Sequence, residues 1–225
     1  MNNLLIVESA GDKYFIEALL NDMNIKLKPT ETVCSIDDYE CLGGIDEREQ
    51  KKLEKKLKFI SNRVDTGQIE SIDKIGIIFD ADKVGTEQRT QDIQDKIDLV
   101  FGEDTKVKFE IYIMNLDGKG ELEDILKEIK TKPSLYADCL SSWRECLSQN
   151  DEHITDKIFN KFWINNYIMY DTCSNAKHRG NKSRYCIFEY AMKEKNIWNF
   201  KHPILDDLKK FLQEIGEKND NTTSN

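Results

Sequence analysis

The stretch KIGIIFDADKVGT, from Lys74 to Thr86, decides the fold of this chain. An apolar run over residues 75–79 ends directly on two aspartates, Asp80 and Asp82. A short apolar run bounded by polar residues is typical of a strand that is buried on both faces of a parallel sheet. Ligands bind beyond the carboxyl ends of such strands, so two carboxylates at this point indicate a functional site.

The segments around this strand alternate between strand and helix. The pattern predicts strands at 3–7, 31–36, 74–79 and 106–114, and helices at 14–22, 47–64, 86–100 and from 121 onward. Strands that alternate with helices form a mainly parallel sheet. We therefore predict an α/β fold whose sheet has about four strands and is flanked by helices.

Beyond Pro133 the pattern is helical. Helices are predicted at 134–148, 153–170, 184–196 and 204–215. The sequence thus predicts three parts: an α/β domain over 1–130, a helical extension over 131–216 packed on it, and a disordered tail over 217–225.

The composition indicates a soluble globular protein in the cytoplasm. Of the 225 residues, 39% are hydrophobic and 33% are charged, and no run approaches the roughly 18 apolar residues of a membrane span. The N-terminus lacks the pattern of a signal peptide. The six cysteines form no CxxC pair, so we expect buried free thiols in a reducing compartment.

The charge is acidic overall but uneven along the chain. A net charge of −9 disfavours simple electrostatic binding of nucleic acid. Residues 51–63 nevertheless carry six basic groups against one Glu, and residues 172–202 carry seven against two. Such islands bind phosphates locally, although a basic helix is also explained as a solvated face.

Acidic residues follow three of the predicted strands. They are Glu8 and Asp12 after the first strand, Asp80 and Asp82 after the third, and Asp117, Glu121, Glu123 and Asp124 after the fourth. Carboxylates crowded at one sheet edge repel unless a cation lies among them, and Mg²⁺ and Mn²⁺ prefer such ligands. We expect one or two divalent ions here, as in enzymes that act on phosphodiesters. Two simpler interpretations stay open: Asp12 caps a helix, and the acids at 121–124 complement a helix dipole.

The string IIFDADKV also fits phosphatases of the haloacid dehalogenase type. In them Asp80 would be the nucleophile and Asp82 the acid/base. That fold expects a paired-acid motif after a later strand, whereas this chain has NLDGKGELED there and an extra acid, Glu8, after its first strand. A receiver domain would need the paired acids after its first strand, which is the opposite arrangement.

Three motifs together resemble the Toprim domain: LLIVESAGDKYFIEALL, KIGIIFDADKVGT and IYIMNLDGKGELEDIL. Toprim domains occur in topoisomerases, DnaG-type primases, small RNA-maturing nucleases and the overcoming-lysogenization-defect (OLD) nucleases. Over residues 1–130 the chain looks most similar to small prokaryotic Toprim-like proteins of uncharacterised function that are related to OLD-family nucleases. The segment HPILDDLKKFL resembles the closing helix of that group.

The resemblance implies roles for individual residues. Glu8, Asp80 and Asp82 would be catalytic and hold metal, and Asp12, Glu121 and Glu123 would be further metal ligands. A lysine beyond the domain would stabilise charge at the phosphate, with Lys182 favoured over Lys177. The full set expected to bind nucleic acid is Lys177, Arg179, Lys182 and Arg184. Toprim domains usually have Gly after the first Glu, whereas this chain has Ser9.

The resulting hypothesis is a nuclease that uses Mg²⁺ or Mn²⁺ to hydrolyse DNA or RNA. The OLD resemblance adds a possible partner ATPase in a defence-type system. The alternative is a non-catalytic Toprim-fold subunit for interaction or sensing, in which the acids hold a structural cation. The oligomeric state does not follow from the sequence.

Overall fold

The computed structural model describes residues 3–27, 31–32, 47–67, 72–102, 105–173 and 184–218. Contacts divide the chain into two compact units. Unit 1 contains Met1–Gly120 and Pro203–Asn225, and unit 2 contains Glu121–His202. The C-terminal segment therefore belongs with the first half of the chain, whereas the sequence boundaries placed residues 204–215 in the helical extension.

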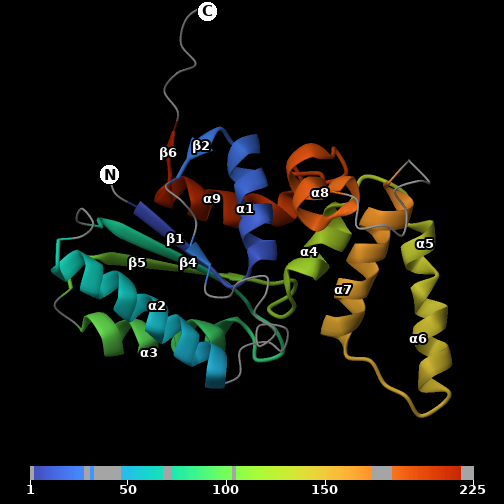
Figure 1. Ribbon diagram of the computed structural model, residues 1–225, viewed down its shortest axis with the longest axis horizontal. Coiled ribbons are helices and arrows are strands. Elements are labelled where there is room, and N and C mark those ends of the chain that lie inside the picture. The colour runs from blue at the N-terminus through green and yellow to red at the C-terminus, as the bar shows by residue number, and fades with distance from the viewer. Residues whose placement is uncertain are drawn as a thin grey trace, which may run out of the picture. The chain divides into compact units, whose positions relative to one another are not determined.

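Unit 1 is built on a parallel sheet with the strand order β3-β1-β4-β5 (Figure 1). β1 spans Asn3–Val7, β4 spans Lys74–Asp80 and β5 spans Lys108–Met114, while β3 is the two-residue strand Glu31–Thr32. Every pair in this sheet is parallel. The α/β prediction is confirmed. The predicted strand 31–36 begins at β3, and its remaining residues lie outside the described part of the chain.

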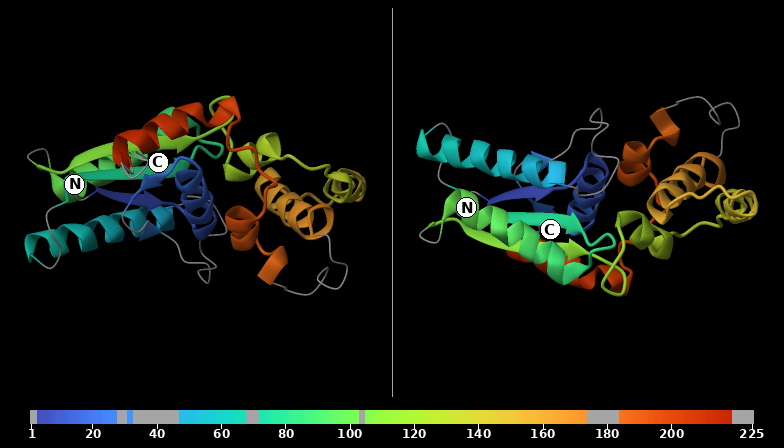
Figure 2. Two further views of the ribbon diagram at one scale, coloured as in Figure 1. Left: turned by 90° about the horizontal axis from the view of Figure 1, so that it is seen from above. Right: turned by 90° about the horizontal axis from the view of Figure 1, so that it is seen from below.

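Helices cover both faces of the sheet. α2 (Glu47–Asp65) and α3 (Thr86–Phe101) lie side by side on one face (Figure 2). They bury an apolar stripe against β4 that includes Leu53, Leu57, Ile60, Ile93 and Ile97. This spacing of three and four residues is the pattern by which an amphipathic helix packs on a core.

The other face of the sheet carries α1 (Ala10–Asp22) and α9 (Asp206–Ile215), which follows a 3-10 turn at Pro203–Leu205. Gly76 lets α9 approach β4, because a Cβ there would lie 2.9 Å from Leu5 Cδ1 and 3.1 Å from Ile215 Cδ1. Next to α9, β6 (Glu217–Lys218) pairs antiparallel with β2 (Ile25–Lys26). Residues 219–225 of the predicted tail lie outside the described chain.

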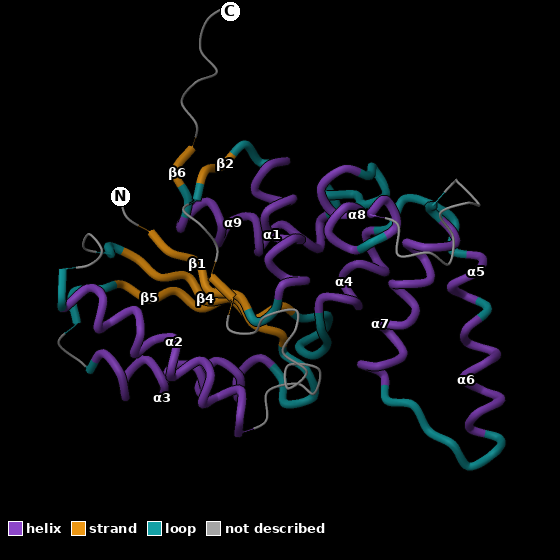
Figure 3. The backbone as a smooth tube through the Cα atoms, viewed as in Figure 1, coloured by secondary structure: helices purple, strands orange, loops and turns teal. Residues whose placement is uncertain are grey.

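Unit 2 is mainly helical (Figure 3). Its elements are α4 (Leu122–Ile129), α5 (Leu135–Asp138), α6 (Leu140–Ser148), α7 (Asp156–Asn166), the π-helix η2 (Tyr167–Asp171), the 3-10 turn η3 (Arg184–Cys186) and α8 (Phe188–Glu194). Its core is aromatic: the rings of Trp163 and Tyr167 stack with centroids 5.5 Å apart, and Trp198 lies 5.5 Å from Tyr167. No described helix is long and apolar enough to cross a membrane.

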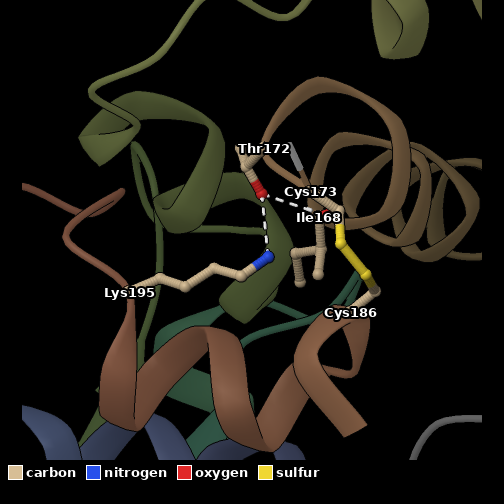
Figure 4. The surroundings of a disulfide bond; sticks show 5 residues. All are labelled: Ile168, Thr172, Cys173, Cys186 and Lys195. Carbon is tan, nitrogen blue, oxygen red and sulfur yellow. Dashed lines mark hydrogen bonds between the residues drawn. A yellow bond between two sulfur atoms is a disulfide. The ribbon is translucent and has the colours of Figure 1, made fainter. Parts of the chain in front are cut away.

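A disulfide joins Cys173 to Cys186 in unit 2, with their Cα atoms 5.9 Å apart (Figure 4). Beside it, Lys195 Nζ donates to Thr172 Oγ1 at 3.4 Å, and Thr172 Oγ1 donates to the Ile168 carbonyl at 2.9 Å. The prediction of free thiols is therefore wrong for this pair, because sequence spacing does not reveal which cysteines meet in space.

Two further cysteines also depart from that expectation. Cys139 and Cys146 are free thiols but exposed rather than buried. Cys34 and Cys41 lie outside the described residues. The expectation of free thiols was the argument for a reducing compartment, and the cytoplasmic location stays a prediction.

Candidate metal centre

Two buried carboxylates meet where neighbouring strands end. β1 pairs with β4 up to Val7 and Ile78, so Glu8 and Asp80 emerge together at the carboxyl edge of the sheet. Each residue is 6% exposed. The Asp80 backbone N–H donates to Glu8 Oε2 at 3.3 Å. The fold thus brings together the two acids that the sequence places at these strand ends.

Asp12 caps the first helix. Its Oδ2 accepts hydrogen bonds from the Ser9 backbone N–H at 2.8 Å and from the Ser9 hydroxyl at 2.7 Å. Ser9 has φ −135°, an extended conformation, so a serine stands here without strain where Toprim domains usually have Gly. The capping interpretation of Asp12 accounts for this geometry, and its role as a metal ligand stays a prediction.

Asp82 is held by a buried arginine. Arg89, which is 2% exposed, donates from Nη2 to Asp82 Oδ2 at 2.9 Å and from Nε to the Asp80 carbonyl at 3.0 Å. Asp82 itself has a left-handed backbone with φ 48°. The guanidinium therefore neutralises Asp82 and fixes the turn that follows β4.

The loops after β4 and β5 are tied together. The Asp82 N–H donates to the Gly120 carbonyl at 2.8 Å, and the Gly120 N–H donates to the Asp82 carbonyl at 3.1 Å. The Thr86 N–H also donates to the Gly118 carbonyl at 3.3 Å. This pairing fixes Gly120, the last residue of unit 1 before Glu121, at the turn after β4.

Three carboxylates converge there. One oxygen each from Asp80, Glu121 and Glu123 lies within 4.8 Å of the others. Glu121 is 4% exposed, and its Oε2 is buried without a hydrogen-bond partner in the described chain. This oxygen accepts no hydrogen bond from the described residues, although Lys157 Nζ lies 3.8 Å from it. A set of carboxylate oxygens fits Mg²⁺ or Mn²⁺. This cluster could bind a metal ion.

Burial favours the protonated forms of Glu121 and Glu123. It raises the pKa of Glu121 to about 7, and the negative charge of Glu123 adds to the rise. Burial likewise raises the pKa of Glu123. The positive charges of Lys157 and Lys161 on α7 oppose both shifts, and Lys157 Nζ lies 3.8 Å from Glu121 Oε2.

A polar network fixes the first turn of α4 against α7. Asp124 Oδ2 accepts from the Glu121 N–H at 3.1 Å, and Asp124 Oδ1 accepts from Asn160 Nδ2 at 2.8 Å. Lys127 donates to Asn160 Oδ1, and burial lowers the pKa of this lysine. Asp124 therefore orients the helix start that carries Glu121 and Glu123.

One family model matches nearly the whole chain. It is described as a protein of unknown function (DUF3226) and matches residues 2–217. The chain belongs to the DUF3226 family. No curated protein and no solved structure matches it. This membership assigns no activity, so a function for this DUF3226 protein is argued from the site.

The structure does not describe the side chains of the basic residues that are expected to bind nucleic acid. Lys177, Arg179 and Lys182 lie outside the described residues of this DUF3226 chain. Arg184 begins η3, but its side chain is also outside the description. Their predicted roles stay predictions.

Sequence reasoning missed three cations of the site: Arg89, Lys157 and Lys161. Arg89 has a recognisable signal, because it stands four and eight residues before Ile93 and Ile97 on the apolar stripe of α3. A cation on such a stripe needs a buried partner. Lys157 and Lys161 lie one turn apart on α7, but nothing in their spacing shows that α7 packs on α4.

Proposed function

We propose that this DUF3226 protein is a divalent-metal-dependent nuclease that hydrolyses phosphodiester bonds of DNA or RNA, with its acids arranged as in a Toprim domain. The observation that carries the proposal is the convergence of Asp80, Glu121 and Glu123, which offer one oxygen each within 4.8 Å of the others.

The metal would be held by Asp80, Glu121 and Glu123, with Glu8 beside Asp80. Bound Mg²⁺ or Mn²⁺ supplies Lewis-acid polarisation of a phosphoryl oxygen and lowers the pKa of coordinated water. The protein contributes the placement of these acids. The Asp80 N–H donates to Glu8 Oε2 and so orients the Glu8 carboxylate beside Asp80.

Two lysines of α7 suit the binding of the scissile phosphate. Lys157 is 3.8 Å from Glu121, and Lys161 acts electrostatically on both Glu121 and Glu123. Lysine binds phosphate as a point charge. The carboxylates of the cluster would repel a phosphodiester, and positive charge beside them lowers this repulsion. We assign these lysines the charge-stabilising role that the OLD resemblance implies for Lys182.

The phosphatase alternative has less support. It needs the Asp82 carboxyl to be available to the leaving group, but Asp82 Oδ2 accepts a hydrogen bond from the buried Arg89 Nη2 at 2.9 Å. The non-catalytic alternative, in which the acids hold a structural cation, remains the second candidate because the buried Glu121 oxygen supports it equally well. A partner ATPase stays part of the proposal and would act by switching the nuclease on.

The test is cleavage of supercoiled DNA, single-stranded DNA and RNA with Mg²⁺ or Mn²⁺. Asp80→Asn and Glu121→Gln should abolish cleavage while the fold, followed by circular dichroism, is kept. Glu128→Gln is the matched control, because Glu128 lies on α4 with an exposed side chain. Calorimetry with Mn²⁺ tests the metal site by itself: metal binding that is lost in Glu121→Gln, without cleavage by the wild type, would mean a metal site that is structural or that awaits its partner. Absence of both cleavage and metal binding would refute the proposal.

A further inference from the structure

The helix α2 separates its charges between two flanks. Its buried stripe contains Leu53, Leu57 and Ile60. At about 100° per residue, one flank carries Lys52, Lys55, Lys56, Phe59 and Arg63 within an arc of roughly 100°. Among the described side chains of α2 this flank has no acid. The opposite flank holds Glu54 and Lys58, which pair at 2.6 Å, and Asp65.

An aromatic ring stands exposed among these cations. Phe59 is 52% exposed. Lys56 Nζ lies 5.9 Å and Arg63 Cζ lies 5.3 Å from the centre of its ring. Cations at this distance are attracted to the ring, so the two side chains and Phe59 form one surface.

We propose that this basic flank of α2, made of Lys52, Lys55, Lys56, Phe59 and Arg63, binds a single-stranded nucleic acid. The cations take the backbone phosphates, and a base stacks on Phe59. The choice of a nucleic acid among polyanions rests on the proposed function. The surface itself does not depend on the acid cluster, since none of its residues belongs to that cluster.

Charge complementarity favours a nucleic acid over a second copy of the chain. Lysine is depleted from protein–protein interfaces but serves phosphate binding well. The acidic helix beside α2 is α3, and its aspartates already have partners in their own helix. Gln88, Gln91 and Gln94 each donate to the aspartate four residues later at 2.7 Å.

The test measures binding without metal or cleavage. Fluorescence anisotropy of labelled single-stranded DNA and RNA is recorded in EDTA, with the full chain carrying Asp80→Asn. One variant changes Lys52, Lys55, Lys56 and Arg63 to Gln. A matched variant changes four exposed lysines outside α2, Lys26, Lys106, Lys108 and Lys210, to Gln, so the net charge is the same. Phe59→Leu keeps an apolar side chain but removes the ring.

The α2 variant should bind at least about tenfold more weakly. The slope of the logarithm of its binding constant against the logarithm of the salt concentration should become less negative by up to about 3, at roughly 0.7 for each lost phosphate contact. Phe59→Leu should weaken binding about fivefold or more through lost stacking. The matched variant should change affinity less than about threefold. Melting curves confirm that each variant is folded.

Several results would overturn the inference. Equal losses in the two four-lysine variants would mean that only net charge matters. The inference would also fail if the parent protein did not bind single-stranded DNA or RNA. It would fail as well if the parent protein self-associated and the α2 variant alone lost this self-association, because the flank would then be a protein interface. Failure of the proposed function looks different: binding behaves as expected in EDTA, but the wild type cleaves nothing with metal. Cleavage with unaltered binding in the α2 variant would reject this inference alone.

Discussion

Replacing Glu121 with glutamine removes a carboxylate that the metal-free fold disfavours. Glu121 is 4% exposed, and burial raises its pKa from 4.5 to about 7. Each pKa unit corresponds to about 1.36 kcal/mol, so the ionised carboxylate costs the metal-free protein up to about 3 kcal/mol of stability. The charged groups around it are Glu123, Asp124, Lys157 and Lys161.

The direction of the pH effect follows from the raised pKa. The folded state holds the proton more tightly than the unfolded state, so this contribution to stability is complete below about pH 4.5 and lost as the pH rises through about 7. Between about pH 5.5 and pH 8.5 the loss amounts to about 2 kcal/mol. Glutamine does not ionise, so Glu121→Gln should lack this part of the pH dependence.

Urea unfolding of the two proteins in EDTA at both pH values measures the effect. At pH 8.5 Glu121→Gln should be the more stable protein, and its stability should change with pH by about 2 kcal/mol less than that of the wild type. Glu128→Gln should follow the wild type. Mn²⁺ should stabilise the wild type at pH 8.5 and leave Glu121→Gln unchanged. Identical pH dependence in the wild type and Glu121→Gln would refute the reasoning.

Three further changes test the scaffold. Arg89→Met strips Asp82 and the Asp80 carbonyl of their buried partner, and urea unfolding should show a loss of about 3 kcal/mol; an unchanged midpoint would mean that the pair contributes nothing. Cys173 and Cys186 are 13 residues apart, and reducing their disulfide should lower the stability of the wild type by about 3 kcal/mol. The melting temperature of Cys173→Ser/Cys186→Ser should not respond to reductant. Equal sensitivity of the wild type and this variant to reductant would contradict the disulfide. Gly76→Ala places a Cβ 2.9 Å from Leu5 Cδ1 and should cost about 1–3 kcal/mol through overpacking; adding Ile215→Val should restore part of it, and no recovery would argue against crowding under α9.

The sequence predicts the strand that carries Asp80 because a strand buried on both faces must be apolar along its length. β4 indeed has six buried residues in succession before the chain turns. The meeting of Glu8 and Asp80 was predictable for the same reason, since parallel neighbours end at one edge. The local apolar pattern thus predicts β4, and the rule that parallel strands end at one edge predicts the meeting of Glu8 and Asp80.

The remaining features depend on contacts between distant segments. The amphipathic pattern of α9 predicts a helix, but nothing in it says that the helix lies on the sheet of unit 1. The pairing of Cys173 with Cys186 is one of many that six cysteines allow. Lys157 and Lys161 become part of the site only because α7 packs on α4, and Asn160 and Asp124 hold that packing at 2.8 Å.

The acid cluster and the basic flank of α2 should respond to opposite conditions. Without a cation, the carboxylates of Asp80, Glu121 and Glu123 repel a phosphodiester, so substrate binding at the cluster requires metal. Binding at the basic flank of α2 requires none, but it weakens steeply with salt because it releases counterions. Under the proposed function, a chain with a net charge of −9 would use its local cations to bind a nucleic acid before metal and lysines act on one phosphate. Binding that resists EDTA but not salt, followed by cleavage that EDTA abolishes, is the behaviour that this division of charge requires.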